Sequence, residues 1–274
     1  MNADFEGFRE FRDFEHQGWQ QVAARYHGSF ATATVQAVVS LLDAAGVGEG
    51  MRVLDVACGP GYVAAAAAGR GARALGIDFS SEMVAEARRL FPSIDFQEGD
   101  AEGLTLPDRD FDAVVMNFGM LHLGRPQRAT AEAYRVLRKG RFAFSVWDKP
   151  DRTLGFGIVL DAIRKHGDLN APIPPGPPFF RFSDPVESTR LLTEAGFRDV
   201  RIAHVEQTWR FPASDMLFDV MLNASVRNAA LLRAQRPEIL SKIRDTVRSA
   251  VEQHRTPTGF ELPMPAVVFS AARL

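Results

Sequence analysis

The stretch MRVLDVACGPG, residues 51–61, indicates the fold of this chain. Val53–Val56 has the β-branched, apolar character of a strand buried on both faces. The alanine-rich segment Tyr62–Ala68 suits a closely packed helix, so Gly59 and Gly61 fall in the turn between strand and helix. Glycine lets backbone approach a ligand without a Cβ atom in the way, and a helix N-terminus offers unpaired N–H groups. The stretch is therefore typical of a nucleotide-cofactor loop.

A second acidic residue follows the next expected strand. Arg73–Ile77 has the pattern of that strand, and Asp78 stands at its carboxyl end, beyond Gly76. In a doubly wound sheet this position faces the crevice in which a ribose lies, and a carboxylate there accepts hydrogen bonds from both sugar hydroxyls. Each hydrogen bond to a charged group contributes roughly 1.5–3 kcal/mol. Asp78 therefore predicts selection of a nucleoside.

The glycine spacing alone does not distinguish two classes of cofactor. The pattern Gly59-x-Gly61-x-x-Ala64 also satisfies the relaxed fingerprint of dinucleotide-binding proteins. Asp55, two residues before Ala57 at the mouth of the loop, would repel a pyrophosphate, whereas an ammonium group would gain a direct or water-bridged ion pair. Asp55 therefore favours a cationic ligand, and a nicotinamide cofactor is the alternative.

Further segments extend this pattern in the order expected of one family. The loop and Gly76-Ile77-Asp78 are followed by Gly99–Glu102, Leu106-Pro107, Phe111-Asp112, Asn117–His122 and Leu137–Trp147. Together they resemble the motifs of class I S-adenosylmethionine-dependent methyltransferases, above all the small-molecule branch that includes ubiquinone and menaquinone biosynthesis methyltransferases. The resemblance covers roughly residues 19–147. It departs from the family at Ala57, which replaces the first loop glycine, and at Arg138–Arg141, which is shorter than the usual Pro-Gly-Gly turn.

The resemblance implies an α/β fold with a doubly wound, seven-stranded, mostly parallel sheet of the Rossmann-like methyltransferase type. The last strand, expected at Ala266–Ala272, would lie antiparallel between the fifth strand and the sixth, which we expect at Val200–Phe211. Helical insertions would cover the substrate. The expected divisions are an N-terminal helical arm (1–30), a cofactor-binding core (31–150), a lid insertion (151–182), a core continuation (183–211), a helical insertion (212–263) and a final core strand (264–274).

The resemblance also implies S-adenosylmethionine as the cofactor, and the absence of ligand clusters at zinc spacing in the sequence predicts no metal. At the nucleoside, we expect Asp78 at the ribose, Phe79 and Met83 on the faces of the adenine, and Asp100, Ala101 and Glu102 at its amine. In the loop, Asp55 would lie at the ammonium group, and the cofactor would approach the backbone of Ala57, Gly59 and Gly61. Around the rest of the methionine portion we expect Asn117, Phe118 and Tyr26. Trp19 is a further candidate at the methionine end.

His122 is the candidate general base, because it follows the fourth strand near the expected position of the transferred methyl group. The ordinary pKa of an imidazole suits proton abstraction near neutral pH. A structural histidine bonded to backbone is the alternative at this position. Asp148, His27, His166 and His204 are weaker candidates, since the sequence does not fix their positions relative to the methyl group.

The N-terminal segment is expected to form an amphipathic helix. Phe5, Phe8, Phe11 and Phe14 recur every three residues, and Trp19, Val22, Ala23 and Tyr26 continue on a helical period. Such a stripe packs against the core, forms a dimer contact or closes over an active site. A further helix is expected at Ala31–Ala45.

The composition limits the class of protein. The 274 residues carry 32 basic and 34 acidic side chains, a net charge of −2, which gives no sign of the basic surface that nucleic acid requires. The single cysteine, Cys58, excludes an internal disulfide. No apolar run approaches the ~18 residues of a membrane span, and the N-terminus lacks the order of a signal peptide, so the cytoplasm is the expected location.

The sequence therefore predicts an enzyme that transfers a methyl group from S-adenosylmethionine to oxygen, nitrogen or carbon of a small molecule by in-line displacement. A homodimer is a further expectation from the aromatic arm. Two alternatives stay open at this point: a nicotinamide-dependent oxidoreductase, favoured by the glycine spacing, and a catalytically silent module that only binds the cofactor.

Overall fold

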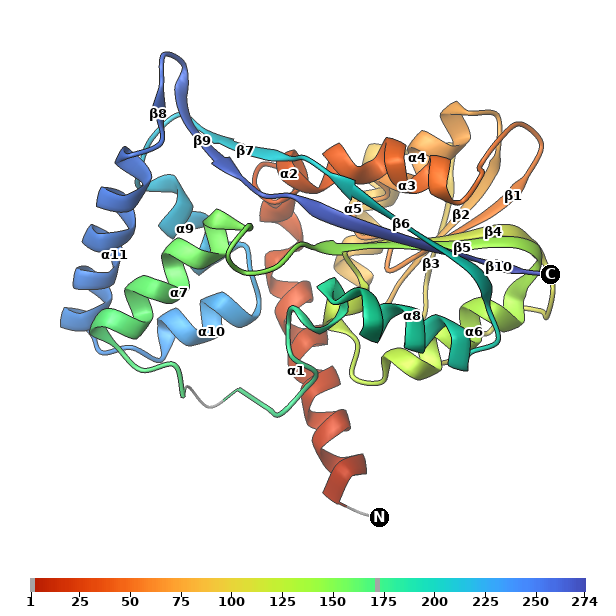
Figure 1. Cartoon of the computed structure of the whole chain (residues 1–274), viewed down its shortest axis with the longest axis horizontal. Helices are drawn as coiled ribbons and strands as arrows, with labels where there is room; N and C mark the ends of the chain where they lie inside the picture. Colours follow the sequence, from red (N-terminus) through yellow and green to blue (C-terminus); the bar gives the residue numbers. More distant parts are fainter. Residues whose placement is uncertain (1–2, 171–172) are drawn as a thin grey trace.

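A seven-stranded sheet forms the centre of the computed structural model, which describes residues 3–170 and 173–274 (Figure 1). Its strands are β1 (Arg52–Val56), β2 (Arg73–Asp78), β3 (Asp95–Glu98), β4 (Phe111–Asn117), β5 (Leu137–Trp147), β6 (Arg198–Val205) and β10 (Ala266–Arg273). Their order is β3-β2-β1-β4-β5-β10-β6. Strand β10 pairs antiparallel with β5 and β6, and the pairings among β1 to β5 are parallel. The expected fold class and the place of the last strand are confirmed.

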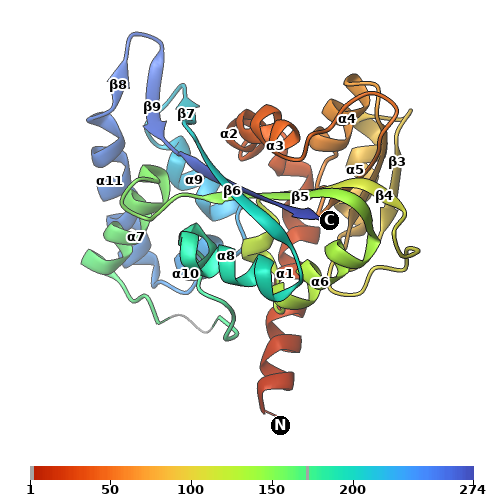
Figure 2. The same cartoon turned by 45° about the vertical axis from the view of Figure 1, so that its right-hand side comes forward.

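Alternate residues of the central strands support two separate cores, as a sheet covered on both faces requires. Val53 and Val115 pack with the core beneath α3 (Val38–Ala44) and α4 (Tyr62–Gly69). Leu54 and Met116 point the other way, into the larger core that includes α6 (Pro126–Val136) and α8 (Pro185–Glu194). The two views show these helix pairs on opposite sides of the sheet (Figure 1 and Figure 2).

Two helices beside the sheet begin at side-chain caps. Ser80 accepts a hydrogen bond from Met83 N at the start of α5 (Ser81–Leu90), and Asp184 accepts one from Val186 N at the start of α8. Such caps satisfy backbone donors that a helix leaves free at its first turn, and each contributes about 1 kcal/mol. The Ser80 cap fixes the start of α5 directly beyond Asp78, at the end of β2.

The helix expected at Ala31–Ala45 is interrupted. The structure has α2 (Ala31–Thr34), a 3₁₀ turn η1 (Val35–Ala37) and then α3. The carbonyl of Thr34 accepts a hydrogen bond from Asn117 Nδ2 at 3.1 Å. We attribute the break to this long-range bond and to the β-branched residues of α2 and η1, which suit a helix interior poorly.

The sixth strand is shorter than expected. Residues 200–211 divide at Gln207, whose carbonyl accepts from Met264 N at 2.9 Å. The second half becomes β7 (Thr208–Phe211), which pairs with β9 (Gly259–Pro263), and β9 pairs with β8 (Arg255–Thr256) in a separate three-stranded sheet. The expectation of one continuous strand at Val200–Phe211 is therefore wrong, because the chain leaves the main sheet at this point.

Four helices gather beside the small sheet, and we name them the helical cap: α7 (Leu154–His166), α9 (Met216–Asn223), α10 (Arg227–Arg233) and α11 (Pro237–Glu252). Figure 1 shows them together at the end of the molecule opposite α4. Short 3₁₀ turns occur at η2 (Met120–His122) and η3 (Arg181–Ser183). The insertion at 212–263 thus contains three helices and also a β-hairpin that the sequence did not indicate.

The N-terminal arm is a single helix, α1 (Ala3–Tyr26), that runs along the molecule beside the cap (Figure 2). Phe11 is buried, whereas Phe8 is exposed. Three parts of the chain lie outside the described residues. They are the first two residues of the arm, the side chain of Phe5, and Ala171 and Pro172 of the proline-rich stretch 171–178. Of the helices in the described part of the chain, none combines the length and apolar character needed to cross a membrane.

Candidate active site

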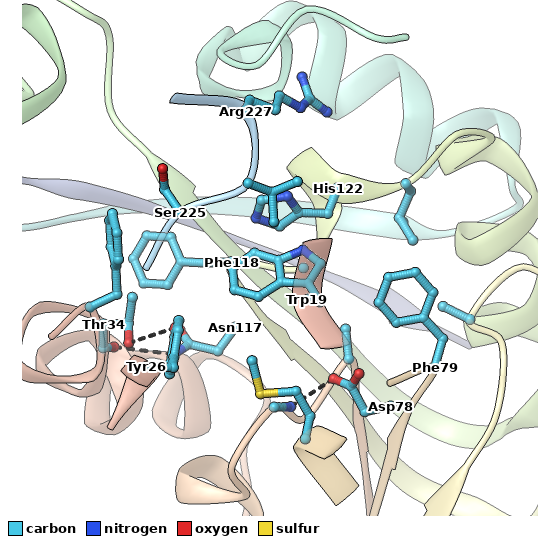
Figure 3. Close-up of a pocket in the computed structure, with 18 of the residues that line it drawn as sticks. Trp19, Tyr26, Thr34, Asp78, Phe79, Asn117, Phe118, His122, Ser225 and Arg227 are labelled. Atoms are coloured by element: carbon cyan, nitrogen blue, oxygen red, sulfur yellow. Dashed lines mark hydrogen bonds between the residues drawn. The ribbon is translucent and has the colours of Figure 1, made fainter. Parts of the chain in front are cut away.

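A cavity of about 1000 Å³, counted to its open mouth, lies at the carboxyl ends of β1, β2 and β4. Open α/β sheets bind ligands at this edge. Figure 3 shows side chains from separate parts of the chain directed toward it. Of the sequence-predicted site residues, the cavity lining includes Tyr26, Ala57, Gly59, Asp78, Phe79, Met83, Asp100, Ala101, Asn117, Phe118 and His122.

The two loop glycines have different tasks. Both have left-handed backbone, with φ of 51° at Gly59 and 85° at Gly61. A Cβ atom on Gly59 would meet nothing within 4 Å, which leaves the space above it open to a ligand. A Cβ atom on Gly61 would lie 2.5 Å from Phe96 Cζ. Gly61 does not line the cavity, so its expected contact with a ligand is not supported, and its role is to pack the loop onto β3.

Asp78 sits at the end of β2 as predicted. Its Oδ2 accepts from Gly59 N at 2.8 Å and its Oδ1 from Ser80 N at 2.9 Å. The side chain lines the cavity although the residue is only 5% exposed. Burial raises the pKa of Asp78 to about 6, and the two backbone donors oppose that rise. Each carboxylate oxygen keeps further acceptor capacity for a ligand hydroxyl.

Asp55 lies behind the loop and not in the cavity wall. It is fully buried, its Oδ2 accepts from Ala64 N at 3.0 Å, and its Oδ1 has no partner among the described residues. Burial raises the pKa of Asp55 to about 8, and nearby Asp78 adds to the rise. A direct ion pair with a ligand ammonium is therefore not supported, because the carboxylate holds the first turn of α4. The neighbouring Cys58 is a buried thiol whose pKa burial raises further.

The far side of the cavity is formed by the start of α5 and the loop after β3. Phe79 and Met83 lie on the lining, next to Ala101. Asp100 accepts from Glu102 N at 2.9 Å through Oδ1 and from Arg12 Nε at 3.0 Å through Oδ2. The Arg12 contact comes from α1 and was not expected from the sequence.

Glu102 is placed differently from the prediction. Its side chain is buried and does not line the cavity. Oε1 accepts from Arg125 N at 2.7 Å, and Oε2 accepts from Arg125 Nε at 2.8 Å. The expected position of Glu102 beside the adenine is therefore corrected: the residue fixes the chain after η2.

Tyr26, Thr34 and Asn117 form a hydrogen-bonded group at the other end of the cavity (Figure 3). The hydroxyl groups of Tyr26 and Thr34 are 3.1 Å apart, and burial raises the pKa of Tyr26 to about 12. Asn117 Oδ1 accepts from Ser145 Oγ at 2.6 Å. Phe118, with φ of 54°, places its ring centroid 4.1 Å from that of Trp147. This end is rigid and mostly apolar.

His122 lines the cavity between Arg227 and Trp19 (Figure 3). Its Nδ1 is 3.0 Å from Glu15 Oε2, and its ring centroid is 4.8 Å from that of Trp19, edge to face. The alternative of a structural histidine bonded to backbone is wrong for the His122 ring, because the partner of its Nδ1 is a carboxylate. His27, His166 and His204 do not line the cavity, and neither does Asp148.

Sequence reasoning missed three groups of this region: Glu15, Arg227 and Thr34. Glu15 carried a signal, because it is an acid four residues from Phe11 on the apolar face of the arm. Arg227 and Thr34 carried none, since their places depend on how the cap and α2 pack. The aromatic side chains of Phe30, Trp147, Phe156 and Phe179 also line the cavity.

Within residues 3–170 and 173–274, no three His, Cys, Asp or Glu side chains are grouped so as to hold a metal ion.

Comparison with known proteins agrees with this geometry. Residues 53–140 match a family model described as a methyltransferase domain. Residues 53–140 of this chain are thus a methyltransferase domain. The methyltransferase domain contains the loop, Asp78, Asp100 and His122, whereas α1 and the cap lie outside the matched residues.

Relatives of known name match about a third of the chain. A demethylmenaquinone methyltransferase of Renibacterium salmoninarum is 41% identical over 100 residues, which are 36% of this chain and 42% of that protein. The chain thus matches less than half the length of this relative.

Solved structures share the fold over a longer stretch. A putative methyltransferase from an antibiotic biosynthesis pathway of Anabaena variabilis has a TM-score of 0.58 at 17% identity and covers 85% of this chain and 96% of its own. A phosphoethanolamine N-methyltransferase of Haemonchus contortus, solved with S-adenosylhomocysteine, has a TM-score of 0.52 at 16% identity and covers 86% of this chain and 52% of its own. These likenesses confirm the Rossmann-like methyltransferase fold.

Proposed function

We propose that this protein transfers a methyl group from S-adenosylmethionine to a small-molecule acceptor. The observation that carries the proposal is one continuous cavity with Asp78 and the open backbone of Gly59 at the nucleoside side and His122 among aromatic rings at the other. The methyltransferase domain match and the S-adenosylhomocysteine in the Haemonchus contortus structure support this choice of cofactor. When bound, S-adenosylmethionine supplies a methyl group on a positively charged sulfur.

The residues at the cavity fit this cofactor. Asp78 offers two carboxylate oxygens at the position where a doubly wound sheet receives a ribose. The space that a Cβ atom would fill at Gly59 is open, so a ligand can lie directly on the backbone there. The unpartnered Oδ1 of Asp55, behind the same loop, is a buried polar atom of the kind that a water molecule satisfies.

Each lining residue then has a proposed part. Phe79 and Met83 flank the adenine, with Asp100 and the Ala101 backbone at its edge. Tyr26, Asn117 and Phe118 surround the methionine portion, and Ala57 and Gly59 give it backbone contact. Asp55, Gly61 and Glu102 support the site from behind.

The main contribution of the chain to catalysis is orientation. The leaving thioether needs no proton, so the enzyme must hold two reactants in line and exclude water. Alignment of this kind supplies effective molarities of about 10⁵–10⁸ M, or roughly 7–11 kcal/mol of the barrier. The aromatic walls of Trp19, Phe156 and Phe179 suit both tasks, because they are stiff and apolar.

The same walls favour a planar, apolar acceptor. This preference agrees with the name of the Renibacterium salmoninarum relative, whose substrate is a quinone derivative. From the sequence we also predict that the protein is located in the cytoplasm and forms a homodimer.

Calorimetry with S-adenosylmethionine and S-adenosylhomocysteine tests the proposal. We expect one-site binding to the wild type, and we expect Asp78→Ala to weaken it by tenfold or more, because tenfold corresponds to ~1.4 kcal/mol and a single bond to a charged group contributes that much. Asp95→Ala, at an exposed site on the neighbouring strand, is the control and should bind as the wild type does. A fluorescence titration with reduced nicotinamide should show no binding. Saturable nicotinamide binding, or Asp78→Ala affinity equal to that of the control, would refute the proposal.

A further inference from the structure

We propose that Glu15 of α1 is a positioning residue that holds His122 with its proton on Nδ1, so that Nε2 accepts the proton of an aromatic hydroxyl on the acceptor. This inference rests on the proposed function and goes beyond it in two respects. It assigns a role to a residue outside the methyltransferase domain, and it gives the acceptor a chemical class.

Glu15 is a fully buried acid with three side-chain donors around it. Oε1 accepts from Arg227 Nε at 2.6 Å, while Oε2 lies 3.0 Å from His122 Nδ1 and 3.2 Å from Trp19 Nε1. Buried charges occur in proteins only where they are paired and hydrogen-bonded. Burial acts to raise the pKa of Glu15, but His122 and Arg227 outweigh it and hold the pKa below its ordinary value. Glu15 is therefore a carboxylate, which can only accept hydrogen bonds.

Arg227 fixes this carboxylate and is itself fully engaged. Besides Glu15, its guanidinium donates to the carbonyls of Pro177 at 3.0 Å and Leu121 at 2.6 Å. The group lies 4.5 Å from the ring centroid of Phe11 and 5.5 Å from that of Phe179. Arg227 therefore joins α1, η2 and the proline-rich segment, and its three nitrogens all have partners within the protein.

The state of His122 follows from its partner. An acceptor-only carboxylate beside Nδ1 requires the ring proton there, which fixes the tautomer of the neutral imidazole. The ring lines the cavity, so Nε2, with its lone pair, is the nitrogen left for a ligand. The carboxylate also stabilises the positive ring that forms when Nε2 takes a proton, as in other base and orienting-acid pairs.

The surroundings of the ring indicate which acceptor suits it. The ring centroid of His122 is 4.8 Å from Trp19 and 6.2 Å from Phe179, both edge to face. An aromatic acceptor packs well among such rings, and its hydroxyl is the group that gains from losing a proton before attack.

Three other charged side chains on or near the elements around His122 are paired elsewhere. Arg12 of α1 pairs with Asp100. Arg181 of η3 pairs with Glu187, and Arg125 beyond η2 pairs with Glu102. The Glu15 carboxylate is therefore the charge that acts on the ring most directly.

The step balances in protons and electrons. His122 Nε2 takes the proton of the acceptor hydroxyl, and the electron pair left on oxygen forms the new bond to the methyl carbon. The carbon–sulfur bond breaks, and its electron pair stays on sulfur, which becomes a neutral thioether. His122 later returns the proton to water. In a hydroquinone the same proton loss also makes the ring carbon beside the oxygen a better nucleophile. After transfer to that carbon, its own C–H proton leaves to water, the electron pair of the C–H bond restores the aromatic ring, and His122 returns its proton to the oxygen.

The tautomer can be measured on the ligand-free protein, whether or not it transfers a methyl group. Nitrogen-15 spectra of the histidine rings, with His122→Gln used for assignment, should show the proton of neutral His122 on Nδ1. In Glu15→Gln the preference for Nδ1–H should weaken, because an amide can accept or donate. A proton found on Nε2 in the wild type overturns the inference.

Kinetics test the consequence, with Glu10→Gln as the matched control at an exposed site on the same helix. The probes are 1,4-naphthohydroquinone, catechol and 4-nitrocatechol, of which the nitro compound has the most acidic hydroxyl. We expect Glu15→Gln to lower kcat for the first two about ten- to a hundredfold, with cofactor affinity changed less than twofold, since a general base contributes about 10²–10⁴-fold. The loss should shrink for 4-nitrocatechol, and the rise of kcat with pH should move in Glu15→Gln and not in the control.

A purely structural role would give a different pattern. It would lower kcat equally for all three probes and leave the pH profile in place, and that result overturns the inference. Transfer to none of the probes by a protein that binds S-adenosylmethionine overturns the acceptor class, whereas failure to bind it refutes the proposed function itself. If Glu15→Gln does not fold because Arg227 is left unpaired, the charge-balanced Glu15→Gln/Arg227→Met variant takes its place, with the same outcomes.

Discussion

The pair Gly61→Ala and Gly59→Ala separates folding from ligand binding within one loop. At Gly61 the left-handed backbone costs an alanine about 1–2 kcal/mol. Its Cβ atom would also lie 2.5 Å from Phe96 Cζ and 3.2 Å from Ala87 Cβ, and overpacking of this kind costs about 1–3 kcal/mol. We therefore expect Gly61→Ala to lower the free energy of unfolding by about 2–5 kcal/mol, which lowers Tm by about 4–9 °C in a chain of this size.

Gly59→Ala should behave in the opposite way. It meets the same backbone cost of about 1–2 kcal/mol, but its Cβ atom meets no protein atom within 4 Å. The methyl group instead occupies the space of the ligand. If it costs about 1–3 kcal/mol of fit there, affinity for S-adenosylhomocysteine falls about five- to 150-fold.

The assays are thermal unfolding and calorimetric titration at a temperature where both variants are folded. Gly69→Ala, at the exposed end of α4, is the control and should raise stability by about 0.5–1 kcal/mol without changing affinity. Gly61→Ala should bind within about threefold of the wild type. Equal loss of affinity in both loop variants, or a Gly61→Ala protein as stable as Gly59→Ala, would refute the division of roles.

Two further predictions concern buried contacts. In the folded protein the pKa of Asp55 is about 8, above the ordinary value of 3.8, so its protonated form stabilises the fold below about pH 4 and this contribution is lost as the pH rises through 8. In urea unfolding, the difference in free energy of unfolding between Asp55→Asn and the wild type should therefore shift by about 1–3 kcal/mol in favour of the variant as the pH rises from 5 to 7.5. The same pH dependence in both proteins would contradict the assignment. A Cβ atom on Gly18 would collide with Val226 Cγ1, so Gly18→Ala should displace α1, speed its proteolysis at least fivefold and weaken cofactor binding. Gly28→Ala, where a Cβ atom meets nothing, should leave both measurements unchanged.

Much of the fold was predictable because it depends on short-range patterns. The apolar run at 53–56, the glycine turn and Asp78 mark β1, the loop and the end of β2 within one segment of chain. The parallel order then follows from the alternation of strands and helices. The break at Gln207 was not predictable, because it depends on the distant Met264.

The site divided in the same way. Residues at strand ends, such as Asp78 and Asn117, fall where the topology directs them. Asp55 and Glu102 were assigned by motif position, which does not indicate whether a side chain turns toward the ligand or behind the loop. Glu15 and Arg227 are 212 residues apart in sequence, so only the packed structure brings them together.

Helix α1 contacts residues at both ends of the cavity. Gln20 of α1 accepts from Ser80 Oγ at 2.6 Å and from Glu82 N at 3.0 Å at the nucleoside edge, and Glu15 holds His122 near the acceptor. Since both contacts belong to the single helix α1, a displacement of this helix would open both ends of the cavity together. In the proposed reaction, a ligand that stabilises α1 at one end of the cavity would therefore also slow release from the other end.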